Sequence, residues 1–148
     1  MKTLNILVST TVGWNIGDEV IREGCLNLVR SVLPNPLNIF YWNRNPDLQQ
    51  TKHGEPIPNL DGAYNNLNIK YDLILIAGSP EFYGPPVNPL YEHAIREKIP
   101  LLIMGVGYAR RDCKVNDLFL EAAKLQTSLV LTRSEETAVD IPGAVALP

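Results

Sequence analysis

The sequence has little that would place the protein outside the cell or in a membrane. Its two cysteines, Cys25 and Cys113, lie far apart in 148 residues and match no metal-binding or redox spacing. We expect Cys25 to be a small buried residue on a helix, with a disulfide as the alternative. No apolar run approaches the roughly 18 residues of a membrane helix, and Leu4–Val8 is too short for a signal peptide. The sequence therefore predicts a cytoplasmic protein with no integral membrane segment.

Charge is also scarce. Charged residues make up 20% of the sequence, and the net charge is -3. This composition lacks the positive footprint of proteins that bind nucleic acid. The hydrophobic content of 45% is ordinary for a globular protein. The length suits one domain, which would bury about two-thirds of its unfolded surface.

Short apolar runs recur along the chain, each bounded by polar or turn residues. Their apolar residues occupy consecutive positions, which is typical of strands covered on both faces. The expected strands are Leu4–Ser9, Leu37–Trp42, Asp72–Ala77, Leu101–Gly105 and Ser128–Thr132.

Helical patterns separate most of these strands. Apolar residues recur with a 3.6-residue period over Asp18–Leu33, Asn88–Lys98 and Val115–Gln126. A short helix is expected after Arg133, because Thr132-x-x-Glu135 has the form of a capping box. This alternation predicts an α/β fold: a doubly wound, mostly parallel Rossmann-like sheet of five to six strands with helices on both faces. The strand order 2-1-3-4-5 is favoured over 3-2-1-4-5, although the sequence does not decide between them.

Two segments interrupt or end this pattern. Asn43–Tyr71 is polar and too long for a plain connection. It is interpreted as an active-site flap, an irregular crossover with a short helix near Asp61–Leu67, or a partly mobile insert. Pro142–Pro148 has the pattern of a turn and a sixth strand, in which the chain ends. We therefore expect residues 1–148 to be a single domain and the N-terminal half of a longer two-domain protein.

The first candidate site is the loop that joins the first strand to the first helix. In open parallel sheets, ligands bind beyond the carboxyl ends of the strands. Here that loop contains Asn15, Gly17, Asp18 and Glu19, but no lysine and no G-x-G-x-x-G pattern. The two carboxylates suit the helix dipole and would repel a bound anion, so a sugar hydroxyl is the better partner. The alternative is that Asn15 or Asp18 only caps the helix.

Three later strands are followed by further candidates. Gly78 would let a ligand approach the backbone, and Ser79 offers a hydroxyl. Gly107 and Arg110 follow the fourth strand, where an arginine could bind a carboxylate or phosphate or remain solvated. Arg133 follows the fifth strand directly, and we expect either a buried ion pair with Asp18 or Glu19 or a ligand contact.

Histidine and metal chemistry are not indicated. His53 lies in the irregular segment and His93 on a helix, and neither completes a catalytic set. No cluster has the ligand spacing of a metal site, so none is expected.

Four motifs in sequence order resemble those of the polysaccharide pyruvyl transferase family. The first strand is followed by Asn15-Ile16-Gly17-Asp18-Glu19, and an Asp-apolar run ends in glycine at Asp72–Gly78. A strand with a glycine turn follows at Ile103–Gly107, and then an arginine with a hydroxyl residue four positions on, Arg133 and Thr137. Two positions differ from the family pattern: Ala77-Gly78-Ser79-Pro80 replaces a glycine cluster, and Ser134 replaces an acidic residue.

The resemblance implies two Rossmann-like domains, as in B-type glycosyltransferases, and a reaction in cell-surface polysaccharide biosynthesis. A pyruvyl group would pass from phosphoenolpyruvate, the donor substrate, to a pair of hydroxyls on a saccharide or glycolipid acceptor, with no metal or other cofactor. Asp18 and Arg133 would be catalytic, the first acting on a hydroxyl and the second offsetting donor charge. The substrate-binding residues would be Asn15, Gly17, Glu19, Gly78, Ser79, Gly107 and Arg110.

The same resemblance places much of the donor-binding machinery in a second domain. The isolated domain is therefore expected to be inactive, and a C-terminal domain or a second copy of the chain would be its partner. Two other functions remain open: a non-catalytic ligand-binding or interaction domain, and half of a nucleotide-sugar glycosyltransferase.

Overall fold

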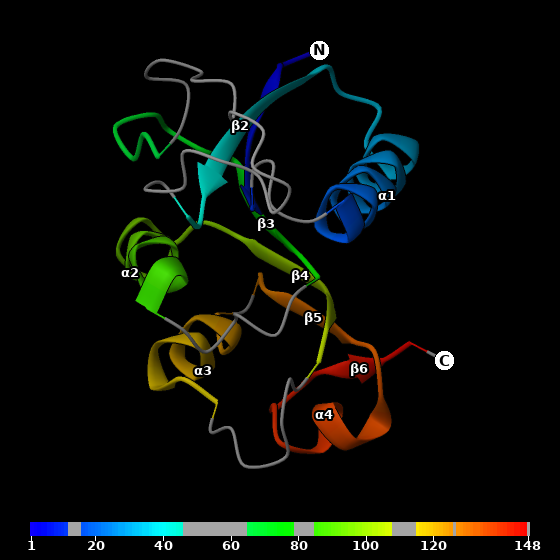
Figure 1. Cartoon of the computed structure of the whole chain (residues 1–148). Helices are drawn as coiled ribbons and strands as arrows, with labels where there is room; N and C mark the ends of the chain where they lie inside the picture. Colours follow the sequence, from blue (N-terminus) through cyan, green and yellow to red (C-terminus); the bar gives the residue numbers. More distant parts are fainter. Residues whose placement is uncertain (12–15, 46–64, 79–84, 108–114, 126, 148) are drawn as a thin grey trace.

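The computed structural model describes residues 1–11, 16–45, 65–78, 85–107, 115–125 and 127–147. Within them, six strands form one parallel sheet in the order β2-β1-β3-β4-β5-β6 (Figure 1). The strands are β1 (Leu4–Thr10), β2 (Leu37–Asn43), β3 (Leu73–Ala77), β4 (Leu101–Val106), β5 (Leu129–Thr132) and β6 (Val145–Ala146). The helices are α1 (Ile16–Val32), α2 (Asn88–Glu97), α3 (Asp117–Ala123) and α4 (Glu135–Val139), with a 3-10 turn, η2, at Pro85–Val87.

This architecture confirms the predicted fold class and the favoured strand order. The expected strands match the observed ones to within one residue at each end, because each is a buried apolar run. The third helix is shorter than the apolar period of Val115–Gln126 suggested. Its N-cap is Asn116, whose side chain accepts a hydrogen bond from the Leu118 amide, so the helix begins at Asp117.

Alternate residues of the strands pack into two hydrophobic cores, one on each face of the sheet. In β1, Leu7 belongs to the core that α2 and α3 cover, whereas Ile6 and Val8 belong to the core under α1. Figure 1 shows α1 on one side of the sheet and α2 and α3 on the other. Consecutive apolar residues in a strand are therefore needed to fill both cores, which explains the continuous runs in the sequence.

The apolar stripe of α1 is wider than the surface that it buries. Cys25, Leu26 and Val29 are buried, whereas Val20 and Val32 are 66% and 67% exposed. The helix therefore contacts the sheet along only one edge of the apolar stripe, and the rest of the stripe is exposed. Cys25 is a free buried thiol, as expected, and burial raises its pKa.

The described end of the Asn43–Tyr71 segment is an irregular crossover. Asn65 has a φ of 60°, and its side-chain oxygen accepts a hydrogen bond of 2.7 Å from the Asn43 amide. The chain then runs without regular structure to Asp72, whose amide donates to the Asn5 carbonyl at 2.8 Å. The expected helix does not extend into residues 65–67. Residues 46–64, where the rest of that helix and of the proposed flap would lie, are outside the described part of the chain.

The short helix after Arg133 is present, but its cap differs from the prediction. Ser134 is the N-cap of α4, and its side chain accepts a hydrogen bond from the Thr137 amide. Thr132 is the last residue of β5, and its hydroxyl donates to the Ser134 carbonyl at 2.9 Å. The N-cap, and with it the start of the helix, therefore lies two residues later than the capping-box pattern implied. Of the helices in the described ranges, none is long and apolar enough to span a membrane.

Candidate functional site

The predicted site residues of the first loop lie where α1 begins, next to the carboxyl end of β1. Gly17, Asp18 and Glu19 form the first turn of the helix, and the two carboxylates complement its dipole. Asn15 lies outside the described residues. The first turn therefore presents negative side chains, as the sequence predicted.

Arg44, directly after β2, is the residue that the sequence analysis missed. The residue is 3% exposed, and its Nε and Nη2 donate hydrogen bonds of 3.1 and 2.8 Å to the Thr11 hydroxyl. Its Nη2 also lies 3.7 Å from a carboxylate oxygen of Asp18. A buried guanidinium thus joins the ends of β1 and β2 to the first turn of α1. Buried charges are costly unless paired, so its position requires these partners.

The guanidinium also influences the core beneath it. Burial raises the pKa of Tyr91 on α2, and the positive charge of Arg44 opposes that rise. The charge of Arg44 therefore acts on α2 as well as on the first turn of α1. One signal in the sequence could have identified it: an arginine immediately after a strand that neighbours β1. In the sequence, Arg44 falls in the irregular segment Asn43–Tyr71, which hides this signal.

A row of buried hydroxyls ends β1. Ser9, Thr10 and Thr11 are each at most 2% exposed. The Thr10 hydroxyl accepts a hydrogen bond of 3.0 Å from Arg22 of α1, whose guanidinium lies 5.3 Å from the centre of the Tyr41 ring. The Ser9 hydroxyl has no hydrogen-bond partner among the described residues. Thr10 and Thr11 thus hold two arginines at this end of the sheet.

Gly78 packs against α1. Its φ is +62°, and a Cβ there would lie 2.7 Å from the Cγ2 atom of Ile21. Its amide donates a 2.7 Å hydrogen bond to the Met104 carbonyl. The space that the sequence analysis assigned to a ligand is therefore occupied by Ile21. The glycine is required by helix packing and by a left-handed backbone conformation.

Gly107 and Arg133, both predicted site residues, are in contact. A Cβ on Gly107 would lie 2.9 Å from Nε and 3.0 Å from Nη2 of Arg133, so the guanidinium rests on the glycine. The Arg133 amide donates to the Val106 carbonyl at 2.9 Å, which fixes the backbone beside β4. Glycine at 107 thus makes room for the arginine and leaves the guanidinium at the carboxyl edge.

Arg133 does not form the expected buried ion pair. The residue is exposed, and the carboxylate of Asp18 pairs with Arg44 instead. The reason is geometric: β2 adjoins β1 directly, whereas β5 is separated from β1 by β3 and β4. A ligand contact by Arg133 remains a prediction. Ser79 and Arg110 lie outside the described residues.

The described edge of the sheet therefore carries one exposed cation, Arg133, and a partly exposed carboxylate, Asp18, which is fixed from below by Arg44. At this edge, Arg133 can donate hydrogen bonds to an anionic ligand, and Asp18 can accept hydrogen bonds from hydroxyls. Within the described ranges, no three His, Cys, Asp or Glu side chains gather in a way that could hold a metal ion.

Comparison with known proteins supports the fold. No protein-family model and no curated protein matches the sequence. The fold is similar to that of a solved AraC family transcriptional regulator from Pseudomonas putida, with a TM-score of 0.52 and 9% identity over 98% of this chain and 76% of that chain. At this identity the likeness concerns the fold alone, and it agrees with a Rossmann-like α/β domain.

Proposed function

We propose that this chain is the saccharide-binding, Rossmann-like domain of a polysaccharide pyruvyl transferase-like protein. The observation that carries the proposal is the position of the motif residues that the structure describes. The first turn of α1, Gly78, and the contact of Gly107 with Arg133 all lie at the carboxyl edge of one parallel sheet. Ligands of open α/β sheets bind at this edge.

The two charged groups at the carboxyl edge fit the two substrates, a saccharide and phosphoenolpyruvate. Asp18, with a side chain 22% exposed, can accept a hydrogen bond from a sugar hydroxyl while Arg44 holds its carboxylate in place. Arg133 is exposed and can pair with the carboxylate or phosphate of phosphoenolpyruvate. In the transfer, both hydroxyls of a diol join the central carbon of the donor, its methylene becomes a methyl group, and phosphate leaves.

Saccharide binding is the first test, because it needs only this chain. A mixture of glycans with free neighbouring hydroxyls would be added to the protein, and saturation-transfer NMR would detect those that bind. We expect Asp18→Asn to weaken binding, and Asp117→Asn, at an exposed position on α3, to leave it unchanged. Absence of saccharide binding, or equal binding by both variants, would contradict the proposal.

Phosphate release is the second test. The protein at its natural length would be incubated with phosphoenolpyruvate and the glycans that bind, and free phosphate and the ketal product would be measured. Arg133→Gln is expected to reduce release by about tenfold or more, because a charge-assisted contact to the donor is lost. Arg30→Gln, on the exposed side of α1, serves as the matched control.

A second candidate function is a non-catalytic ligand-binding domain. The observation that favours it is the ion pair of Asp18 with Arg44, which engages the carboxylate proposed to act on a hydroxyl. Saccharide binding without any phosphate release from the protein at its natural length would support this second function.

A further inference from the structure

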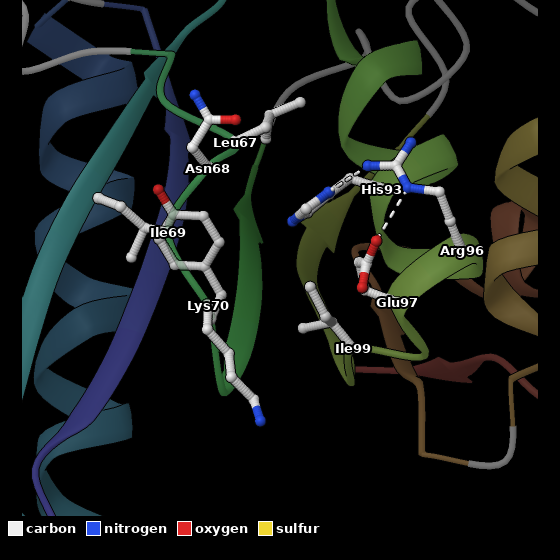
Figure 2. Close-up of a pocket in the computed structure, with 9 residues that line it drawn as sticks. Leu67, Asn68, Ile69, Lys70, His93, Arg96, Glu97 and Ile99 are labelled. Atoms are coloured by element: carbon white, nitrogen blue, oxygen red, sulfur yellow. Dashed lines mark hydrogen bonds and ion pairs between the residues drawn. The ribbon is translucent and has the colours of Figure 1, made fainter.

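A pocket of about 490 Å³ lies at the other end of the sheet, away from the site described above. One wall is the crossover segment Leu67–Tyr71, which precedes β3, and the other is the second half of α2 with Ile99 (Figure 2). Its volume falls within the range of small-molecule sites. Both walls contribute apolar side chains, and most of the lining is polar or charged: Asn68, Lys70, His93, Arg96 and Glu97.

The guanidinium of Arg96 is held in a fixed orientation at this pocket. Its Nη2 lies 2.8 Å from His93 Nδ1, and its Nε donates a 2.9 Å hydrogen bond to Glu97. Figure 2 shows both contacts on the α2 side of the pocket. The Arg96 side chain is nevertheless 63% exposed, so the rest of the guanidinium is available to a ligand. Two acceptors on its own helix thus pre-orient an accessible cation.

His93 is buried in the pocket wall and uncharged. It is 5% exposed, and burial, followed by the charge of Arg96, lowers its pKa. With Nδ1 accepting from Arg96, its proton lies on Nε2, which Figure 2 shows turned toward the opposite wall. That nitrogen has no hydrogen-bond partner among the described residues. Buried polar atoms are nearly always paired, so a donor with no acceptor in this wall is a feature that a ligand would explain.

The charge of the lining selects the kind of ligand. The charged lining residues are two cations, Lys70 and Arg96, and one carboxylate, Glu97. The lining therefore carries a net positive charge, although the protein as a whole is negative. Ile69 and Ile99, on opposite walls, supply apolar surface. We propose that this pocket is a second ligand site, which binds a small organic carboxylate with an apolar body, the carboxylate against Arg96 and the body between Ile69 and Ile99, while Lys70 adds positive charge from the opposite wall.

This proposal does not depend on the function of the carboxyl edge. The probe is 4-phenylbutyrate, and 4-phenylbutanol is its neutral control of similar shape. Both would be titrated into isotope-labelled protein, and amide and side-chain shifts would be followed by NMR. We expect the carboxylate to bind about tenfold more tightly than the alcohol, with shifts concentrated at residues 67–71 and 93–99.

Variants distinguish this pocket from general adsorption. Arg96→Gln and Lys70→Gln alter exposed side chains, so both should fold and bind 4-phenylbutyrate about fivefold or more weakly. Arg30→Gln, on α1 at the opposite face of the sheet, should bind as the unchanged protein does. Equal affinity for acid and alcohol would overturn the proposal, as would unchanged binding by both pocket variants or shifts centred on Gly17 and Gly107.

Discussion

Arg44 and Asp18 form an ion pair across the start of α1, with Nη2 3.7 Å from the carboxylate oxygen. The two partners differ in burial: the Arg44 side chain is 1% exposed and that of Asp18 is 22% exposed. The cation therefore depends on its protein partners far more than the anion does. The pair, together with Thr11, joins β1, β2 and α1 at one point.

Replacing Arg44 by methionine should lower the free energy of unfolding by about 2–3 kcal/mol. This is less than the cost of breaking a fully buried pair, because Asp18 remains partly hydrated. Arg30→Met, at an exposed position, should change stability by less than about 0.5 kcal/mol. Urea unfolding of both variants provides the measurement. A double-mutant cycle with Asp18→Asn should give a coupling energy above about 0.5 kcal/mol, and additive effects would contradict the pairing.

Three glycine-to-alanine substitutions should distinguish the effect of side-chain packing on stability from the effect of helix propensity. Gly78→Ala should destabilise the protein by about 2 kcal/mol or more, because φ is +62° and the new Cβ would meet Ile21. Gly24→Ala should instead stabilise by about 0.5–1 kcal/mol, since no atom lies within 4 Å of its Cβ and the residue is in a helix. Gly107→Ala should have a small effect on stability, because the flexible end of Arg133 can move. Thermal unfolding would rank them, and a stabilising Gly78→Ala would contradict the described packing.

Ser134→Ala should cost about 1 kcal/mol, because the Thr137 amide loses the side-chain acceptor that caps α4. Glu135→Gln tests the cap that the sequence pattern suggested, and it should cost only a few tenths of a kcal/mol through the helix dipole. Denaturant midpoints of the two variants make the comparison. A larger loss for Glu135→Gln would favour the sequence-based assignment.

His93 should make stability depend on pH. Its pKa is lowered from the ordinary value of 6.5, mainly by burial, so the unfolded chain binds the proton more readily than the folded one. Its contribution is therefore complete above pH 6.5 and declines as the pH falls from there toward the lowered pKa. Unfolding free energies measured between about pH 5 and 8 should rise with pH, and this slope should shrink in His93→Asn. An identical slope in the variant would refute the assignment.

A different group acts at lower pH. Hydrogen bonds from Lys2 and from the Asn5 amide lower the pKa of Asp72, so its contribution is lost only as the pH falls below its ordinary value of 3.8. Asp72 is ionised in both the folded and the unfolded chain above about pH 5, so measurements above about pH 5 report on His93 without interference from Asp72.

The fold was predictable from the sequence because each strand must fill two cores. Runs such as Ile74-Leu75-Ile76 can satisfy that requirement only when covered on both faces, and the helical periods between them imply parallel crossovers. What each helix buries was less predictable. In α1 the apolar stripe is wide, and only contact with the sheet determines that Leu26 is buried and Val32 is exposed.

The site was predictable in position but not in its internal contacts. Asp18 and Arg133 were predicted from their places after strands, but the expected ion pair between Arg133 and Asp18 or Glu19 was wrong, since Asp18 pairs with Arg44. The burial of Arg44 arises from the register that sets Thr10 beside Asn43, a contact between residues distant in sequence. No local pattern near Arg44 encodes that contact. The same holds for His93, whose surroundings come from the crossover segment.

The position of β1 in the sheet has a consequence for how the chain reaches its native state. β1 is the first strand in the sequence, but one of its two neighbours is β3, whose residues follow about seventy positions later, as the pairing of Ile6 with Leu73 shows. Parallel pairings of this kind form only after a large loop has closed, and sheets built from them fold slowly. During synthesis, β1 leaves the ribosome before β3 and must therefore wait for this second partner. In that interval one edge of β1 is unpaired, and an unpaired apolar strand favours aggregation.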